Sequence, residues 1–187
     1  MIGRGIGAVL AVAMLAGCVA QQAQVVDSSD AASFRVTDVT VEAARAASAD
    51  PRGFDLGEDQ TETLLRGAVL DTLDDLNPAG TRSVTVALDV SRIFVANPAT
   101  AVVGRSGSVA EATAQLLDAR TGAAIGAPFA VSGGTGTRLG GVIGAAITAG
   151  TLVDGGQQGE ITRIGLGLGN TVAQAVFGTD SGADAGG

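Results

Sequence analysis

Alternating apolar and polar residues mark the strands of this chain. Between residues 83 and 95 the apolar positions recur at every second residue, at Val84, Val86, Leu88 and Val90. Such alternation predicts a strand with one buried face. Residues 108–117 alternate in the same way, and Asp118-Ala-Arg-Thr-Gly122 then reads as a hairpin turn that leads into a returning strand over 125–131. Pro128 suits an edge strand, because proline cannot donate to a strand ladder.

Apolar residues at helical spacing mark a helix over residues 58–77. Its apolar stripe consists of Leu64, Leu65, Ala68, Val69, Leu73 and Leu76. We expect Asn77-Pro78 to end the helix, because the residue before a proline avoids helical dihedral angles. Leu73 and Leu88 should both be buried where this helix crosses the sheet.

The first strand is predicted over residues 34–41. Its apolar positions change phase between Val36 and Val39, which predicts a bulge near Asp38. A closing helix is predicted over residues 161–177, although Gly165, Gly167 and Gly169 should weaken it by about 1 kcal/mol each relative to alanine.

These elements predict an α+β fold with a single mixed or antiparallel sheet of about four strands and two helices on one face. The domain should span residues 34–177, with a glycine-rich apolar segment at 133–160 and a disordered tail at 178–187.

The N-terminus has the features of an export signal. One arginine precedes an uncharged, mostly apolar run over residues 5–15, which is too short to span a bilayer as a helix. The run ends in Leu15-Ala16-Gly17-Cys18, which matches a bacterial lipobox. We therefore predict a signal peptide over 1–17, a diacylglycerol and an N-acyl chain on Cys18, and a tether over 18–33. Val19 replaces the aspartate that retains enterobacterial lipoproteins in the inner membrane, which favours the outer membrane, facing the periplasm.

Composition excludes many kinds of chemistry. The net charge is −8, and the chain contains no histidine, no lysine and one cysteine. An acidic chain without a basic cluster is a poor nucleic-acid binder. Catalytic sites that need an imidazole, an amine or a thiol, and most zinc or copper sites, are also excluded. We therefore expect no enzyme activity, no metal and no cofactor beyond the covalent lipid. A carboxylate-based hydrolase remains an alternative, and it would require two carboxylates in one pocket.

Two short patterns have the residue types of a binding site. Asp55, Glu58, Asp59 and Glu62 could offer oxygen ligands to Ca²⁺, but they lack the loop spacing that would place them around an ion. The sequence Gly165-Leu-Gly-Leu-Gly169 could present backbone N–H groups to phosphate, but a lone glycine pattern is weak. A solvated helix start and a structural role are the favoured interpretations.

Residues 139–153 form an uncharged run rich in glycine and alanine. Small residues at Gly140 and Gly144 are typical of closely packed helices. One interpretation is a loop before the last helix. The other is an interaction segment for oligomerisation or membrane contact, carried by Leu139, Gly140, Val142, Ile143, Gly144 and Ile147.

Several stretches together resemble a family of short α-proteobacterial lipoproteins known as a domain of unknown function. These stretches are FRVTDVTVEA, the leucine-rich helix, SVTVALDVSRIF and LLDARTGAAI, between Phe34 and Val131. More loosely, the layout is similar to the lipopolysaccharide-assembly lipoprotein, the curli-secretion lipoprotein and the N-terminal domain of TolB. The resemblance implies a sheet with helices on one face and a role at the cell envelope, and it supplies no catalytic motif.

The expected function is therefore that of an outer-membrane-anchored periplasmic lipoprotein. It would act as a non-catalytic accessory or assembly factor that binds an envelope protein or a lipid through a sheet edge or the apolar segment. An oligomeric secretion or pore component that uses residues 139–153 is the alternative, and a homo-oligomer is compatible with both.

Overall fold

The computed structural model describes residues 24–44, 56–95, 107–135 and 156–178. Its elements in chain order are α1 (Ser28–Ala31), β1 (Phe34–Glu42), α3 (Glu58–Leu73), β2 (Arg82–Phe94), β3 (Val109–Asp118), β4 (Ala124–Gly134) and α6 (Gly156–Phe177). The sheet order is β1-β2-β3-β4. β1 and β2 are parallel, whereas β2, β3 and β4 are successively antiparallel. The predicted mixed four-stranded sheet is confirmed.

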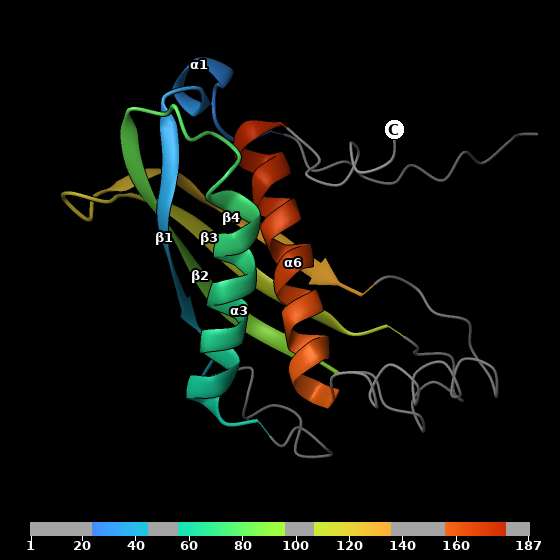
Figure 1. Ribbon diagram of the computed structural model, residues 1–187. Helices are drawn as coiled ribbons and strands as arrows, with labels where there is room; N and C mark the ends of the chain where they lie inside the picture. Colours follow the sequence, from blue (N-terminus) through green and yellow to red (C-terminus); the bar gives the residue numbers. More distant parts are fainter. Residues whose placement is uncertain (1–23, 45–55, 96–106, 136–155, 179–187) are drawn as a thin grey trace, which may run out of the picture.

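Helices α3 and α6 lie side by side on one face of the sheet (Figure 1). Helix α3 packs on β1 and provides the crossover that a parallel β1–β2 pair requires. Helix α6 packs against α3 and, within the sheet, mainly against β4. Within the described residues, no helix combines the length and the apolar character needed to cross a bilayer.

The phase change in the first strand is resolved by a bulge, as predicted. The β1–β2 register shifts between Val36 and Asp38, so Thr37 is the extra residue. The bulge keeps Phe34, Val36 and Val39 on the buried face. A second shift, between Val90 and Arg92, was not predicted, and it returns Ile93 to the core.

The predicted hairpin is also confirmed. Gly122 has a φ of 71° in the turn between β3 and β4, a conformation that favours glycine. Pro128 lies in β4, which is an edge strand. The missing N–H of Pro128 therefore falls where the ladder does not need it.

Helix α3 ends at Leu73, and the prediction that it continues to Asn77 was wrong. The chain leaves the helix early because the side chain of Asn77 bonds to the start of β1. Its Nδ2 donates to the carbonyl oxygens of Ala32 at 3.0 Å and Phe34 at 2.8 Å. The Ala32 and Phe34 carbonyl oxygens thus gain a donor at the edge of the sheet. A helix that continued to Asn77 would not have supplied this donor.

The core lies between the sheet and the two helices. Leu73 and Leu88 are 1% and 2% exposed, which confirms their predicted burial. The apolar stripe of α6 is wholly buried and consists of Ile161, Ile164, Leu168, Val172 and Val176. This helix begins at Gly156 and β4 ends at Gly134. Both ends of the predicted glycine-rich segment 133–160 therefore belong to regular elements.

The glycines of α6 allow close packing, a role that the predicted weakening did not take into account. A Cβ built on Gly165 would lie 2.7 Å from the Ala68 Cβ, and one on Gly169 would lie 2.7 Å from the Thr72 Cβ. On another side of the helix, a Cβ on Gly167 would lie 2.7 Å from the backbone nitrogen of Gly134. The glycines therefore let α6 approach α3 and β4 at the same time.

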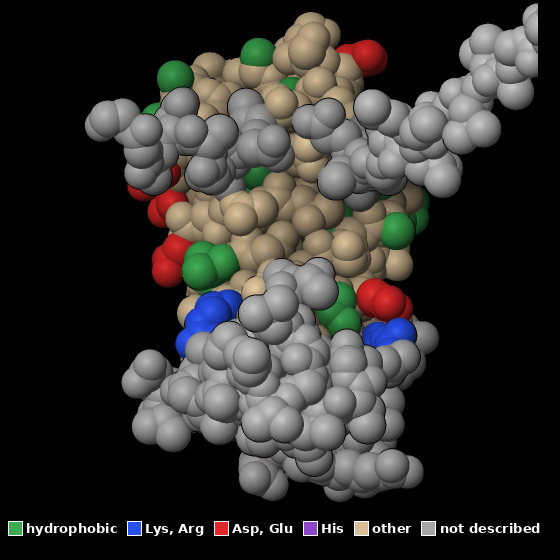
Figure 2. Space-filling view, turned by 90° about the vertical axis from the view of Figure 1, so that its right-hand side faces the viewer, with side chains coloured by type: hydrophobic (Ala, Val, Ile, Leu, Met, Phe, Trp, Pro, Cys, Tyr) green, Lys and Arg blue, Asp and Glu red, His purple; other side chains and the backbone are tan. Residues whose placement is uncertain are grey.

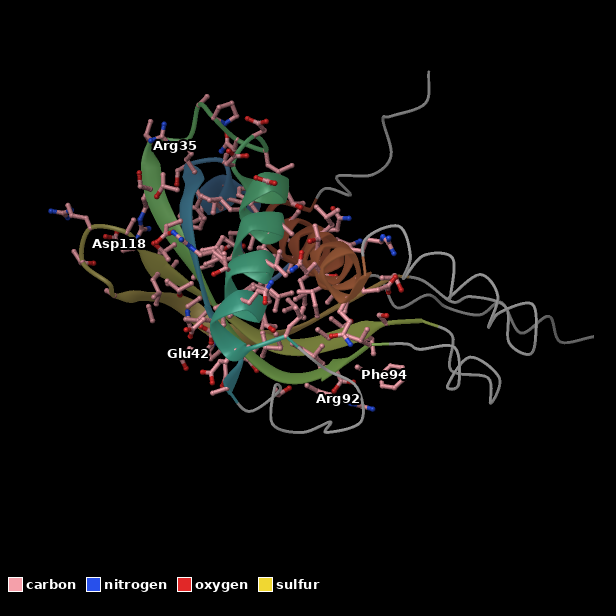
Figure 3. All side chains as sticks on the ribbon, turned by 60° about the horizontal axis from the view of Figure 1, so that its bottom comes forward. Arg35, Glu42, Arg92, Phe94 and Asp118 are labelled. Carbon is pink, nitrogen blue, oxygen red and sulfur yellow. The ribbon has the colours of Figure 1, made fainter. Side chains whose placement is uncertain are left out.

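The described segments end at two opposite poles of the domain (Figures 1 and 3). At one pole the chain enters at Gln24, whose Nε2 donates to the Val176 carbonyl oxygen at the end of α6. Figure 3 labels Arg35 and Asp118 toward this pole. The other pole holds the ends of β1, β2 and β4 and the start of α6, with Glu42 and Phe94 labelled there. Residues 24–33, predicted as part of the tether, thus lie against the domain in part.

Candidate functional site

A groove of about 370 Å³ separates edge strand β1 from α3. Its lining residues are Asp38, Val39, Thr40, Val41, Asp59, Glu62, Thr63 and Arg66. Strand β1 supplies one wall after its bulge, and the first two turns of α3 supply the other. Asp59 and Glu62, two of the four possible Ca²⁺ ligands in the sequence, therefore lie in one groove with Asp38.

Arg66 ties the two walls of the groove together. Its Nη2 donates to Asp38 Oδ1 at 2.7 Å, and its Nε donates to the Val39 carbonyl oxygen at 2.7 Å. The hydrogen bond from Arg66 holds the pKa of Asp38 below its ordinary value. Asp38 is therefore ionised at neutral pH and is unsuited to donate a proton.

Glu62 contacts the end of the same strand. Its Oε1 accepts a hydrogen bond from the Ala43 backbone N–H at 2.8 Å. Together with Asn77 and Arg66, it satisfies backbone groups at three places on or just beyond β1. Side chains of α3 and the following turn thus protect an edge that could otherwise pair with another strand.

No group of three or more His, Cys, Asp or Glu side chains in the described residues could hold a metal ion. Glu58 and Asp59 are exposed at the start of α3, and Asp55 lies outside the described residues. The carboxylate-based hydrolase alternative requires two carboxylates in one pocket, and Asp38, Asp59 and Glu62 line this groove together. Asp38 is bonded to Arg66 and Glu62 to a backbone N–H, so both carboxylates have partners within the fold.

A second groove of about 380 Å³ lies on β2, β3 and β4. It is lined by Ser91, Glu111, Ala112, Thr113, Ala130, Val131 and Ser132. The Ser91 hydroxyl donates to the Glu111 carbonyl oxygen at 3.1 Å, and the Glu111 carboxylate pairs with Arg92 at 3.5 Å. These contacts are exposed and polar, and they lie at the register shift between Val90 and Arg92.

One buried carboxylate was missed from the sequence. Glu160 is fully buried in the first turns of α6. Its Oε2 accepts a hydrogen bond from the Ser108 hydroxyl at 2.6 Å, and its Oε1 accepts one from Arg163. The network joins the start of β3 to the start of α6. A glutamate one residue before the apolar stripe that begins at Ile161 was the available signal.

The predicted lipidation site and interaction segment lie outside the described residues. These are Leu15, Ala16, Gly17 and Cys18, and Leu139, Gly140, Val142, Ile143, Gly144 and Ile147. Both remain predictions. Gly165, Gly167 and Gly169 are within α6, where helical geometry and close packing replace the phosphate-binding loop considered above.

Comparisons with known proteins give structural likeness alone. No protein-family model matches the chain, and no curated protein matches it. The chain is similar to a solved structure described as a "putative lipoprotein" from Caulobacter crescentus CB15. The identity is 16% and the TM-score 0.36, over 83% of this chain and 96% of that one.

The chain is also similar to PelC from Paraburkholderia phytofirmans, solved as a dodecamer. A PelC variant shares 14% identity at a TM-score of 0.28, covering 73% of this chain and 90% of that one. A second PelC crystal form gives 13% identity and a TM-score of 0.26, covering 74% and 88%. Likenesses at these scores transfer no function to this chain.

Proposed function

We propose that this chain is a lipid-anchored lipoprotein of the outer membrane whose periplasmic domain binds a partner and does not catalyse a reaction. The observation that carries the proposal is the sequence Leu15-Ala16-Gly17-Cys18, placed directly after an apolar run of signal-peptide length. Acyl chains on Cys18 would each contribute about 0.8 kcal/mol per buried CH₂, so that two or three chains hold the protein firmly.

The position of Gln24 supports an anchored domain close to the membrane. Its side chain bonds to Val176, and the backbone N–H of Val25 donates to the Ala175 carbonyl oxygen at 2.7 Å. Only residues 19–23 separate this docked segment from Cys18. Six extended Cα–Cα steps reach roughly 20 Å, so the domain would be held near the lipid surface.

The side-chain chemistry supports a binding role. Within the described residues, the carboxylates that converge do so in the β1–α3 groove, where Arg66 and a backbone N–H engage two of them. The buried Glu160 bonds Ser108, which is only 2% exposed. A hydroxyl so enclosed has no access to a substrate, so this pair joins two elements of the fold.

Fractionation of cells that produce a Cys18→Ala variant tests the anchor. After growth with a radioactive fatty acid, the parent protein should carry the label and be recovered in the outer-membrane fraction. The variant should lack the label and remain uncleaved or soluble in the periplasm. Val19→Asp is a matched variant that keeps the acyl chains and tests the choice of membrane. Normal processing and outer-membrane recovery of Cys18→Ala would contradict the proposal.

A further inference from the structure

The C-terminal end of α6 is completed by residues from the other end of the described chain. The last four carbonyl groups of an α-helix have no partner within the helix. In α6 the Ala175 carbonyl oxygen accepts a hydrogen bond from the Val25 backbone N–H at 2.7 Å. The Val176 carbonyl oxygen accepts one from Gln24 Nε2 at 3.0 Å. We call these two hydrogen bonds the clip, and they satisfy carbonyl groups that would otherwise depend on water.

The same N-terminal segment is held again where it enters the sheet. The Ser33 carbonyl oxygen accepts a hydrogen bond from the Arg82 backbone N–H at 2.8 Å. The Ala32 carbonyl oxygen accepts the bond from Asn77 described above. Helix α1 lies between these bonds and the clip, beside the end of α6 (Figure 1). We define residues 24–33 as the strap, which therefore has two separate attachments, one on α6 and one at the start of β1.

Among the described residues, few contacts hold the clip. Gln24, Val25 and the last turn of α6 carry no charge, so no ion pair strengthens it. Figure 2, which views the domain from the side of α6, shows mostly uncharged side chains and backbone across the middle of the described surface. The Val25 side chain is 48% exposed, and the next residue, Val26, is only partly buried. The clip therefore depends mainly on its two hydrogen bonds.

Helix α1 does not hold the strap in place by itself. It contains four residues, and its N-cap residue Asp27 makes no side-chain hydrogen bond to it. A helix of this length is not stable in water without tertiary contacts, and the contact that α1 buries is Ala31, which is 3% exposed. Strand β1, in contrast, buries Phe34, Val36 and Val39. Terminal segments with few buried contacts open locally while the core stays folded, so we expect the strap to open before β1 does.

We propose that the strap is a releasable tether that gives the anchored domain two distances from the membrane. This inference rests on the lipid proposed for Cys18. With the clip closed, six Cα–Cα steps link Cys18 to Gln24 and reach roughly 20 Å. With the clip open, fifteen steps link Cys18 to Ser33 and reach roughly 50 Å. The sheet and its two long helices are the same in both states, so a partner farther from the bilayer can bind the same folded domain.

Proline substitutions separate the clip from the rest of the strap. Val25→Pro removes the N–H that donates to Ala175, because proline has none. Ser28→Pro is the matched control, since Ser28 is the first residue of α1, where proline is tolerated. The preceding Asp27 has a φ of −58° and a ψ of 136°, which are compatible with a following proline. Gln24→Ala removes the other donor of the clip and is a milder second variant.

Hydrogen exchange of the full chain, purified in detergent micelles, measures how the strap opens. The Ala31 and Ala32 backbone N–H groups donate to carbonyl oxygens within the strap, whereas Val86 lies in the centre of β2. The two alanine amides should exchange faster than the Val86 amide and independently of low urea concentrations, since local opening exposes little surface. Val25→Pro should speed their exchange about fivefold or more, and Ser28→Pro should not. A Val86 amide whose exchange still depends on urea shows that each variant folds.

Energy transfer to a bilayer measures the reach of the strap. Thr113 is exposed in β3, so Thr113→Cys carries a donor dye in the parent chain and in each variant, with Cys18 occupied by its lipid. The chains are inserted into vesicles that contain an acceptor lipid. Transfer should be lower in Val25→Pro than in the parent chain or in Ser28→Pro, because the open strap lets the domain lie farther from the acceptors.

Three outcomes would overturn the proposal. Strap amides that exchange as slowly as the Val86 amide, with the same dependence on urea, would show that residues 24–33 open only when the core unfolds. Strap amides that are unprotected in the parent chain would show that the clip does not hold. Unchanged energy transfer in Val25→Pro, despite faster exchange, would show that opening does not alter the reach. A parent chain that fails to bind vesicles would instead contradict the lipid anchor, and the exchange rates would still decide whether the strap opens.

Discussion

Gly165 and Ala68 meet where α6 crosses α3, so closely that a Cβ added to Gly165 would lie 2.7 Å from that of Ala68. Gly169 and Thr72 form the same kind of contact one helical turn later. The spacing of four residues places both glycines on one face of α6, where they set the separation of the two helices.

Gly165→Ala and Gly169→Ala should each destabilise the domain by about 1–3 kcal/mol, because the added methyl group forces the helices apart. Gly67→Ala is the matched control. It lies in α3 with nothing within 4 Å of an added Cβ. It should stabilise the helix by about 0.5–1 kcal/mol. Urea denaturation measures all three, and a stabilised Gly165→Ala would show that the close contact does not constrain packing.

The buried leucines give a second prediction. Leu73→Ala and Leu88→Ala should each lower the free energy of unfolding by about 2–5 kcal/mol, because each leaves a cavity in the core. Leu166→Ala is the control, since Leu166 is 41% exposed. Leu166→Ala should lower the free energy of unfolding much less than Leu73→Ala or Leu88→Ala does. Equal effects at all three positions, measured by chemical denaturation, would contradict the assigned core.

The third prediction concerns the buried network at the start of α6. Ser108→Ala removes the hydroxyl that donates to Glu160 at 2.6 Å. Loss of a donor to a buried carboxylate should cost about 1–3 kcal/mol. Ser132→Ala is a surface control, because Ser132 is exposed. If both variants melt at the parent temperature, the hydrogen bond contributes nothing to stability.

The pH dependence of stability gives a fourth prediction. Hydrogen bonds from Thr121 hold the pKa of Asp118 below 3.8, and Arg66 does the same for the pKa of Asp38. A carboxylate with a lowered pKa in the folded state contributes stability above its unfolded pKa. That contribution is lost as the pH falls below 3.8 and through the folded value.

Between pH 5 and pH 2, roughly the range in which carboxylates titrate, the melting temperature of the double variant Asp38→Asn and Asp118→Asn should therefore fall less than that of the parent protein. The difference should be small, because the exposed Asp38–Arg66 pair contributes at most about 1 kcal/mol. Calorimetric melts across this range measure it. A steeper loss in the double variant would mean that these carboxylates are not stabilised in the folded state.

The sequence pattern predicted the sheet because each strand has one buried face. The phase change at Val36 and Val39 predicted the bulge, since a bulge is the way to keep both residues in the core. Pro128 predicted an edge strand because its missing donor is tolerated there. These features depend on neighbours in sequence, which a linear pattern contains.

Features that depend on distant partners were missed. The end of α3 depends on Asn77 reaching β1, more than forty residues earlier in the chain. Gly165 is costly in an isolated helix, and its use becomes visible only with Ala68 opposite. The burial of Glu160 depends on Ser108 from another strand. In each case tertiary contacts override the local preference.

The order of elements along the chain also limits when the core can close during synthesis. Strand β1 is made first, yet its partner β2 begins at Arg82, and α6, whose apolar stripe is fully buried, spans Gly156–Phe177. Contacts between segments so far apart in sequence form only after the chain has lost the conformational entropy of closing a long loop. A nascent chain therefore leaves the part of the sheet that α6 covers exposed to water until this last helix is complete, and truncation before residue 156 would leave that part without its cover.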